Sequence, residues 1–208
     1  MLLIVTAVGA EARAIGPLER CVVIAGGIGR TNAAAATTEA ILRRRGDTAA
    51  VICAGVAGAL PDGGLEVGDV IVASKCVYAE EGIVTSAGFA DMAGLGFRLG
   101  DFQGNAVPVD ERLLEQLSEL FPIGPIATVA TCSGTDAAAA EVARRTAAVA
   151  EAMEGAAVVH AARRLGVPAI ELRTISNRCG ERENQRWDLK RALSKLGEAM
   201  RQAVGLLV

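Results

Sequence analysis

Short runs of consecutive apolar residues recur along the chain without alternating polar positions. A strand that is apolar at successive positions is buried on both faces, so these runs predict a sheet that helices cover on each side. Small or polar residues end each run. We predict strands at residues 2–8, 21–25, 50–54, 70–77, 126–130 and 169–175.

Helical patterns separate the predicted strands. Residues 31–45 and 154–165 are rich in alanine, and leucines recur at helical spacing in residues 110–120. Residues 189–204 form an amphipathic helix near the C-terminus. This alternation of strands and helices predicts an α/β sandwich. Residues 78–107 are rich in glycine and show no clear pattern.

Nothing in the pattern divides the chain. The sequence has no linker rich in proline or serine, no repeat and no low-complexity tail, so residues 1–208 are predicted to form one domain. Hydrophobic residues make up 51% of the chain and aromatic residues only 3%, which indicates an aliphatic core. No apolar run reaches the roughly 18 residues of a membrane helix, and the N-terminus lacks the basic lead of a signal peptide.

Charge and cysteine usage narrow the class of protein further. A net charge of −3 and a pI near 5.3 exclude a strong overall attraction to nucleic acids or anionic membranes. The basic run at residues 43–45 is interpreted as the end of a helix, with an anion-binding patch as the alternative. The five cysteines are odd in number and show no C-x-x-C spacing, which favours reduced thiols in the cytoplasm. His160 is the single histidine, so a metal centre built on several histidines is excluded.

Two glycine-rich segments follow predicted strands. Gly27 and Gly29 form a G-x-G without the third glycine of a dinucleotide site, which is compatible with a structural turn or with a loop that faces a ligand. Residues 54–58, Ala-Gly-Val-Ala-Gly, either form a tight bend or let a ligand approach the backbone.

Two polar residues stand at element boundaries. Glu154 lies at the start of a helix, where the dipole favours a carboxylate and where a carboxylate can also accept hydrogen bonds from a ribose diol. Asn177 follows a predicted strand, and such strand ends line the ligand crevice in open α/β sheets. Asparagine is also common in turns, so the strand end alone does not decide its role.

The order of these segments resembles the nucleoside phosphorylase/nucleosidase superfamily over nearly the whole chain. The motifs that carry the resemblance are Gly-Ile-Gly at 27–29, Gly-Val-Ala-Gly at 55–58, Gly-Asp-Val at 68–70 and Met-Glu at 153–154. The resemblance implies a three-layer α/β/α sandwich with a mixed central sheet.

A second set of motifs is similar to the futalosine hydrolase family within that superfamily. These motifs are Met-Glu-Gly-Ala-Ala at 153–157, Arg-Thr-Ile-Ser-Asn at 173–177, and Gly-Glu-Arg at 180–182 leading to Trp-Asp at 187–188. The resemblance implies hydrolysis of the N-glycosidic bond of futalosine, which releases hypoxanthine and dehypoxanthine futalosine in menaquinone biosynthesis, without a metal or organic cofactor.

The resemblance also implies roles for individual residues. Met153 and Glu154 would bind the ribose, and Glu11 would position the attacking water. Gly134 and Thr135 would border the base. A loop around the ligand would come from Val56, Ala57 and Gly58.

Asn177 falls where adenine-type nucleosidases carry an aspartate that protonates N7. The asparagine amide can donate to N7 or O6 of a 6-oxopurine and accept from its N1–H. It cannot act as a formal acid, but it can stabilise negative charge on the leaving base. The substitution therefore favours hypoxanthine over adenine.

The residues around the expected site favour water over phosphate as the nucleophile. Phosphate needs several cationic or hydroxyl donors, whereas Val56 offers no hydroxyl and Glu11 repels an anion. Arg13 and Arg30 remain candidates for holding phosphate.

The candidate partners of the benzoate at the 5′ end of futalosine are Arg178, Arg182 and Arg186. The simpler interpretation is that these three arginines are exposed on a loop and bind no ligand. The resemblance implies a homodimer or larger homo-oligomer, with Phe102 and Pro108 near the interface.

Three other functions stay open at this point. A methylthioadenosine/S-adenosylhomocysteine nucleosidase is disfavoured by Asn177 and by the segment that ends at Trp187. An inosine-type purine nucleoside phosphorylase would require phosphate. A nucleoside-binding protein without turnover would share the fold, which by itself does not decide function.

Overall fold

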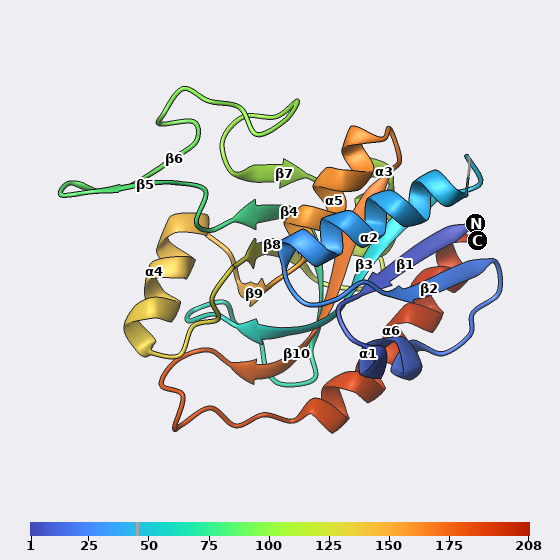
Figure 1. Cartoon of the computed structure of the whole chain (residues 1–208). Coiled ribbons are helices and arrows are strands. Elements are labelled where there is room, and N and C mark those ends of the chain that lie inside the picture. The colour runs from blue at the N-terminus through green and yellow to red at the C-terminus, as the bar shows by residue number, and fades with distance from the viewer. Residues whose placement is uncertain (45) are drawn as a thin grey trace.

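The computed structural model describes residues 1–44 and 46–208 (Figure 1). One mixed sheet of eight strands forms the centre, in the order β10-β4-β8-β9-β3-β1-β2, with β7 paired to β4. These strands are β1 (Leu2–Thr6), β2 (Cys21–Ala25), β3 (Ala50–Ala59), β4 (Val70–Tyr78), β7 (Ala106–Pro108), β8 (Ile123–Thr128), β9 (Ala150–Ala152) and β10 (Ala169–Arg178). A separate hairpin consists of β5 (Gly82–Thr85) and β6 (Gly88–Asp91).

The long strand β10 closes part of the sheet on itself. It pairs parallel with β3 along one edge and antiparallel with β4 along the other. Since β3 and β4 are also joined through β9 and β8, the five strands form a ring of pairings. Side chains at the ends of these strands are therefore held in one rigid frame.

Helices cover both faces of the sheet, which confirms the sandwich. The helices are α1 (Gly9–Ile15), α2 (Arg30–Arg43), α3 (Glu111–Ser118), α4 (Asp136–Thr146), α5 (Gly155–Arg164) and α6 (Leu189–Leu207). Helices α2 and α5 pack together on one side, and α1 packs against α6 on the other (Figure 1). In the part of the chain that the structure describes, no helix combines the length and apolar content needed to cross a lipid bilayer.

Two strands extend beyond the predicted ends. Strand β3 continues through residues 54–58 to Ala59, so the interpretation of this segment as a tight bend is wrong. Strand β10 continues through Asn177 to Arg178, with an irregular register between Ile175 and Asn177. Both extensions contain small or polar residues that a hydrophobicity pattern does not assign to a buried strand.

Several short elements escaped the sequence pattern, among them α1, α4 and the three-residue strands β7 and β9. Helix α4 does carry a start signal, because the Thr135 hydroxyl accepts a hydrogen bond from the Ala138 N–H. At the basic run, α2 ends at Arg43, whereas Arg45 lies outside the described residues.

Helix α6 contains two glycines in contrasting surroundings, which permits a matched test of the packing. A Cβ on Gly197 would lie 2.3 Å from the Ala14 carbonyl oxygen of α1, whereas a Cβ on Gly205 would meet nothing within 4 Å. Gly197→Ala should therefore lower the free energy of unfolding by about 1–3 kcal/mol. Gly205→Ala should leave it equal or raise it by up to about 1 kcal/mol. Urea unfolding of both variants measures this, and equal stabilities would contradict the described α1–α6 contact.

Candidate active site

A cavity of about 260 Å³ opens where the ends of β3, β9 and β10 meet the loops after β1 and β2. Most of the residues expected at the site line it. They are Glu11, Val56, Ala57, Gly58, Met153, Glu154 and Asn177. The fold thus brings together residues that lie up to 166 positions apart in the sequence, from Glu11 to Asn177.

Glu11 is held rigidly in the cavity wall by backbone donors. One carboxylate oxygen accepts from the N–H groups of Ala7 (2.9 Å) and Val8 (3.1 Å), and the other accepts from Val56 N–H at 2.9 Å. The residue is buried, with 3% of its surface exposed. Three N–H donors fix the orientation of this carboxylate and stabilise its charge.

Glu154 occupies the N-cap position of α5 but makes no capping bond. One carboxylate oxygen accepts from Gly29 N–H at 3.0 Å, and the other lies 3.2 Å from Nη2 of Arg173. The glycine-rich turn after β2 therefore holds Glu154 in place from the far side of the site.

Arg173 is a central residue to which sequence reasoning gave no role. It is 1% exposed and donates from Nε to Glu171 at 2.8 Å and from Nη1 to the Val56 carbonyl at 3.3 Å. Its Nη2 bonds Glu154 and also lies 3.2 Å from Cys53 Sγ. Arg173 thus links Glu154 to the β3 backbone, next to the amide that holds Glu11.

Glu171 supports Arg173 from beneath the cavity. It is fully buried, and burial raises the pKa of its carboxyl, an effect that the neighbouring Arg173 opposes. Its second oxygen has no hydrogen-bond partner in the described structure. A Cβ on Gly155 would lie 1.9 Å from that oxygen, so only glycine fits beside Glu154.

Asn177 lies at the irregular point of β10 and is buried. Its Oδ1 accepts from the Ser176 hydroxyl at 2.9 Å, and its Nδ2 donates to the Arg178 carbonyl at 3.2 Å. Each amide atom thus makes one bond, so Oδ1 keeps a second lone pair and Nδ2 a second hydrogen for a ligand.

Gly134 and Thr135 do not line the cavity. The chain passes the cavity two residues earlier, where Cys132 and Ser133 form part of the wall, and Thr135 instead caps α4. A register error of this size is expected for a loop that has no hydrophobic pattern of its own.

The three arginines after Asn177 lie outside the main cavity. Arg178 and Arg186 line a neighbouring hollow of about 380 Å³, and Arg178 forms an ion pair with Glu66. Arg182 lies 5.4 Å from the ring of Trp187, which lines the main cavity. Gln185 borders both spaces, so the hollow adjoins the cavity.

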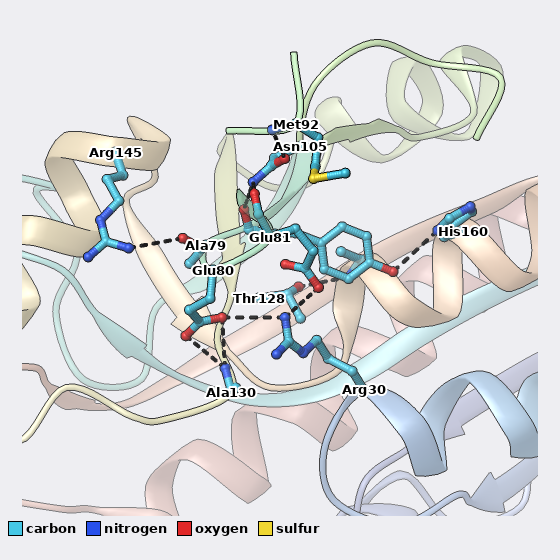
Figure 2. A network of polar contacts seen from close by, with 12 residues as sticks. Arg30, Ala79, Glu80, Glu81, Met92, Asn105, Thr128, Ala130, Arg145 and His160 are labelled. Atoms are coloured by element: carbon cyan, nitrogen blue, oxygen red, sulfur yellow. Dashed lines mark hydrogen bonds and ion pairs between the residues drawn. The ribbon is translucent and has the colours of Figure 1, made fainter. Parts of the chain in front are cut away.

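Arg30 joins two loops of the site and is engaged by carboxylates. It lies 2.5 Å from Glu81 and 3.4 Å from Glu80, and Glu80 in turn accepts from Ala130 N–H at 2.9 Å (Figure 2). The loop after β2, which holds Glu154, is thereby tied to the loop after β8. Arg13 is exposed on α1 and does not line the cavity.

The two residues expected near an interface belong to the chain's own packing. Phe102 is 7% exposed and stacks edge-on against His160 at 5.1 Å between ring centres. Pro108 pairs with Lys75 in the sheet. Phe102 therefore offers little surface to a second copy.

Removal of Arg173 tests its structural role. Arg173→Met leaves Glu171 and Glu154 without their cation and should lower the free energy of unfolding by about 3–5 kcal/mol. Without the arginine the pKa of Glu171 rises further. When burial raises the pKa of a carboxyl, the folded protein becomes less stable as pH rises from the pKa of that group in the unfolded chain to its pKa in the folded chain. The loss should therefore be larger at about pH 8 than at about pH 5.

Urea unfolding at the two pH values measures this. Arg43→Met, which removes an exposed pair with Glu39, is the control and should change little at either pH. A pH-independent loss in Arg173→Met would contradict the role assigned to the Glu171 charge.

Known proteins resemble this chain in sequence and in structure. The profile of the phosphorylase superfamily matches residues 8–208. A futalosine hydrolase of Acidothermus cellulolyticus is 43% identical over 155 residues, which are 72% of this chain and 62% of that protein, so the match spans less than two thirds of that relative. A futalosine hydrolase of Streptomyces coelicolor is 35% identical over 85% of this chain and 75% of its own length.

Solved structures agree in fold. A futalosine hydrolase mutant of Helicobacter pylori has a TM-score of 0.80 with 22% identity and covers 98% of both chains. A 5′-methylthioadenosine/S-adenosylhomocysteine nucleosidase of the same organism has a TM-score of 0.80 with 20% identity over 98% of this chain and 97% of that one. The structures establish the fold, and the sequence relatives refine the assignment. The chain belongs to the phosphorylase superfamily and, within it, to the family of the futalosine hydrolases.

Proposed function

We propose that this protein hydrolyses the N-glycosidic bond of futalosine, releasing hypoxanthine and dehypoxanthine futalosine in menaquinone biosynthesis. The observation that carries the proposal is that Glu11, Glu154 and Asn177 line one cavity. The names of the two bacterial relatives supply the substrate. A protein that only stores a nucleoside would need groups such as Glu154 and Asn177 to bind it, but it would not need a carboxylate placed as Glu11 is to activate water.

Each of these residues has a separate role in the proposed reaction. Glu154 accepts hydrogen bonds from the 2′ and 3′ hydroxyls of the ribose, and Met153 packs beside the sugar. As the bond from C1′ to the purine lengthens, positive charge develops on the sugar, and Glu11 orients and deprotonates the attacking water. Asn177 donates from Nδ2 to the purine and stabilises the negative charge that the leaving base acquires. The base then takes a proton from solvent and Glu11 releases to solvent the proton it removed from water, so hypoxanthine leaves neutral. The scheme requires no cofactor.

The charges around the cavity favour water over phosphate. Of the described residues that line it, Arg173 is the one cation, and it is already bonded to Glu171 and Glu154. Arg30 is engaged by two carboxylates outside the lining, and the buried Glu11 repels a dianion. An inosine-type phosphorylase is therefore the weaker alternative.

The hollow beside Trp187 suits the acidic 5′ end of futalosine. It adjoins the cavity through Gln185 and is lined by Arg178 and Arg186, whose charge can meet a benzoate. Asp136 and Glu181 also line it, and each of their carboxylates accepts from the backbone N–H of the other residue. Trp187 is 46% exposed at the mouth of the cavity and offers an aromatic face.

Further proposals concern the assembly and location. The β5–β6 hairpin, which extends from the body of the molecule in Figure 1, exposes 78% of Val84, and Phe97 nearby in sequence is 63% exposed. Exposed apolar side chains of this kind support a homodimer or larger oligomer. The five free thiols support a cytoplasmic location.

The direct test incubates the purified protein with futalosine, inosine and methylthioadenosine, each with and without phosphate, and separates the free bases by chromatography. We expect hypoxanthine from futalosine at a rate that phosphate does not change, and little adenine from methylthioadenosine. Glu11→Gln keeps the size of the side chain and should lower kcat by about 100-fold or more. Release of adenine, or a requirement for phosphate, would overturn the proposal. Light scattering on the same sample measures the oligomeric state.

Arginine variants test the 5′ subsite. Arg178→Ala, Arg182→Ala and Arg186→Ala are compared on futalosine and inosine, since only futalosine carries the carboxylate. Loss of an arginine that meets the benzoate should raise KM for futalosine by about 10-fold and leave inosine unchanged. If all three variants affect both substrates equally, these arginines do not bind the benzoate.

A further inference from the structure

Glu151 is a buried carboxylate in the cavity wall that the proposed reaction does not use. It is 4% exposed, and its two oxygens accept from the N–H of Ser133 at 2.7 Å and from the Ser133 hydroxyl at 2.6 Å. Within residues 1–44 and 46–208, no lysine or arginine forms an ion pair with it. A buried carboxylate ordinarily has a cationic partner or a full set of donors. Glu151 therefore retains acceptor capacity toward the cavity.

The sheet register places Glu151 and Asn177 on opposite sides of one glycine. Gly58 of β3 pairs with Asn177 of β10 along one edge and with Glu151 of β9 along the other. Neighbouring strands lie about 4.8 Å apart, so the two outer Cα atoms are separated by roughly 10 Å. Directly paired residues direct their side chains to the same face of a sheet. Both side chains thus flank Gly58 on the face that lines the cavity.

Gly58 leaves room for the Cys179 thiol between these two side chains. A Cβ at this position would lie 3.3 Å from Nδ2 of Asn177 and 2.5 Å from Sγ of Cys179, so the thiol packs directly over the glycine. The cavity wall here therefore presents an amide from Asn177 and a carboxylate from Glu151. A heterocycle whose edge carries an acceptor beside a donor matches this pair.

We infer that Glu151 is the second residue that recognises the purine, accepting N1–H of a 6-oxopurine while Asn177 donates to O6 or N7. The inference deepens the proposed function and rests on it. For N1–H the charged carboxylate of Glu151 is a stronger acceptor than the neutral amide oxygen of Asn177, which also accepts from Ser176. A 6-oxopurine presents N1–H next to O6, whereas a 6-aminopurine presents a bare N1 lone pair that the carboxylate repels. Glu151 thus selects hypoxanthine over adenine.

Ser133 acts as a positioning residue for this recognition. Its two donors hold both carboxylate oxygens of Glu151 and fix the plane of the carboxylate. Each oxygen keeps another lone pair for the base.

Glu151→Gln tests the inference, because glutamine can donate to a bare N1 where glutamate can only accept. We compare kcat/KM for futalosine and for its 6-amino analogue in the wild type and the variant. The variant should lower the ratio of 6-oxo to 6-amino activity by about 10- to 100-fold. Glu39→Gln, on the exposed face of α2, is the matched control and should leave the ratio unchanged. A ratio that is equal in the wild type and in Glu151→Gln overturns the inference.

Calorimetry with free bases separates this inference from the proposed function and needs no variant. The wild type should bind hypoxanthine about 10-fold or more tightly than adenine and than 1-methylhypoxanthine, which lacks N1–H. Equal affinities would overturn the role of Glu151 even if futalosine is hydrolysed. If the bases are discriminated but futalosine is not cleaved, the proposed function fails and the base recognition stands.

Ser133→Ala, which removes the hydroxyl that donates to Glu151, should lower the base discrimination less than Glu151→Gln does.

Discussion

The buried guanidinium of Arg173 is the interaction on which the site depends. It lies in the middle of β10, fully enclosed, and bonds Glu171, Glu154 and the backbone of β3. A charge in a protein interior is tolerated only when its partners are close and well aligned. The ring of strands β3, β9, β8, β4 and β10 supplies that alignment, because β10 is paired along both edges. The geometry of the candidate site therefore depends on the closure of the sheet.

The rest of the cavity follows from the same frame. Glu11 and Glu154 contact neither each other nor the same donor, yet both are fixed relative to Val56, one through its N–H and the other through Arg173 on its carbonyl. Small residues in β3 leave space for these long polar side chains above the sheet. Glu11 and Glu154 can therefore stand in one small cavity, each held by its own donors.

Part of this arrangement was predictable from the sequence. Uninterrupted apolar runs predicted the starts of β1, β2, β3, β4 and β10, whereas β8 begins at Ile123, three residues before its predicted start. Glu11, Glu154 and Asn177 came from motif resemblance. Residues 171 and 173 are two positions apart on a strand and so share one face, a signal that could have predicted the Glu171–Arg173 pair. The strand ends were missed because glycine, serine and asparagine occur there inside β3 and β10. The pairing of Glu151 and Asn177 across Gly58 depends on a register between distant strands, which no local pattern contains.

The glycines at 55 and 155 have a consequence for how mutations in this protein are understood. A side chain at position 55 would collide with Glu11 and Arg173, and one at position 155 would collide with Glu171. Neither glycine needs to touch a substrate to be indispensable. In a survey of all single substitutions, both positions would rank with the carboxylates proposed for catalysis, and a map of activity alone would draw the active site larger than the set of residues proposed to contact the nucleoside.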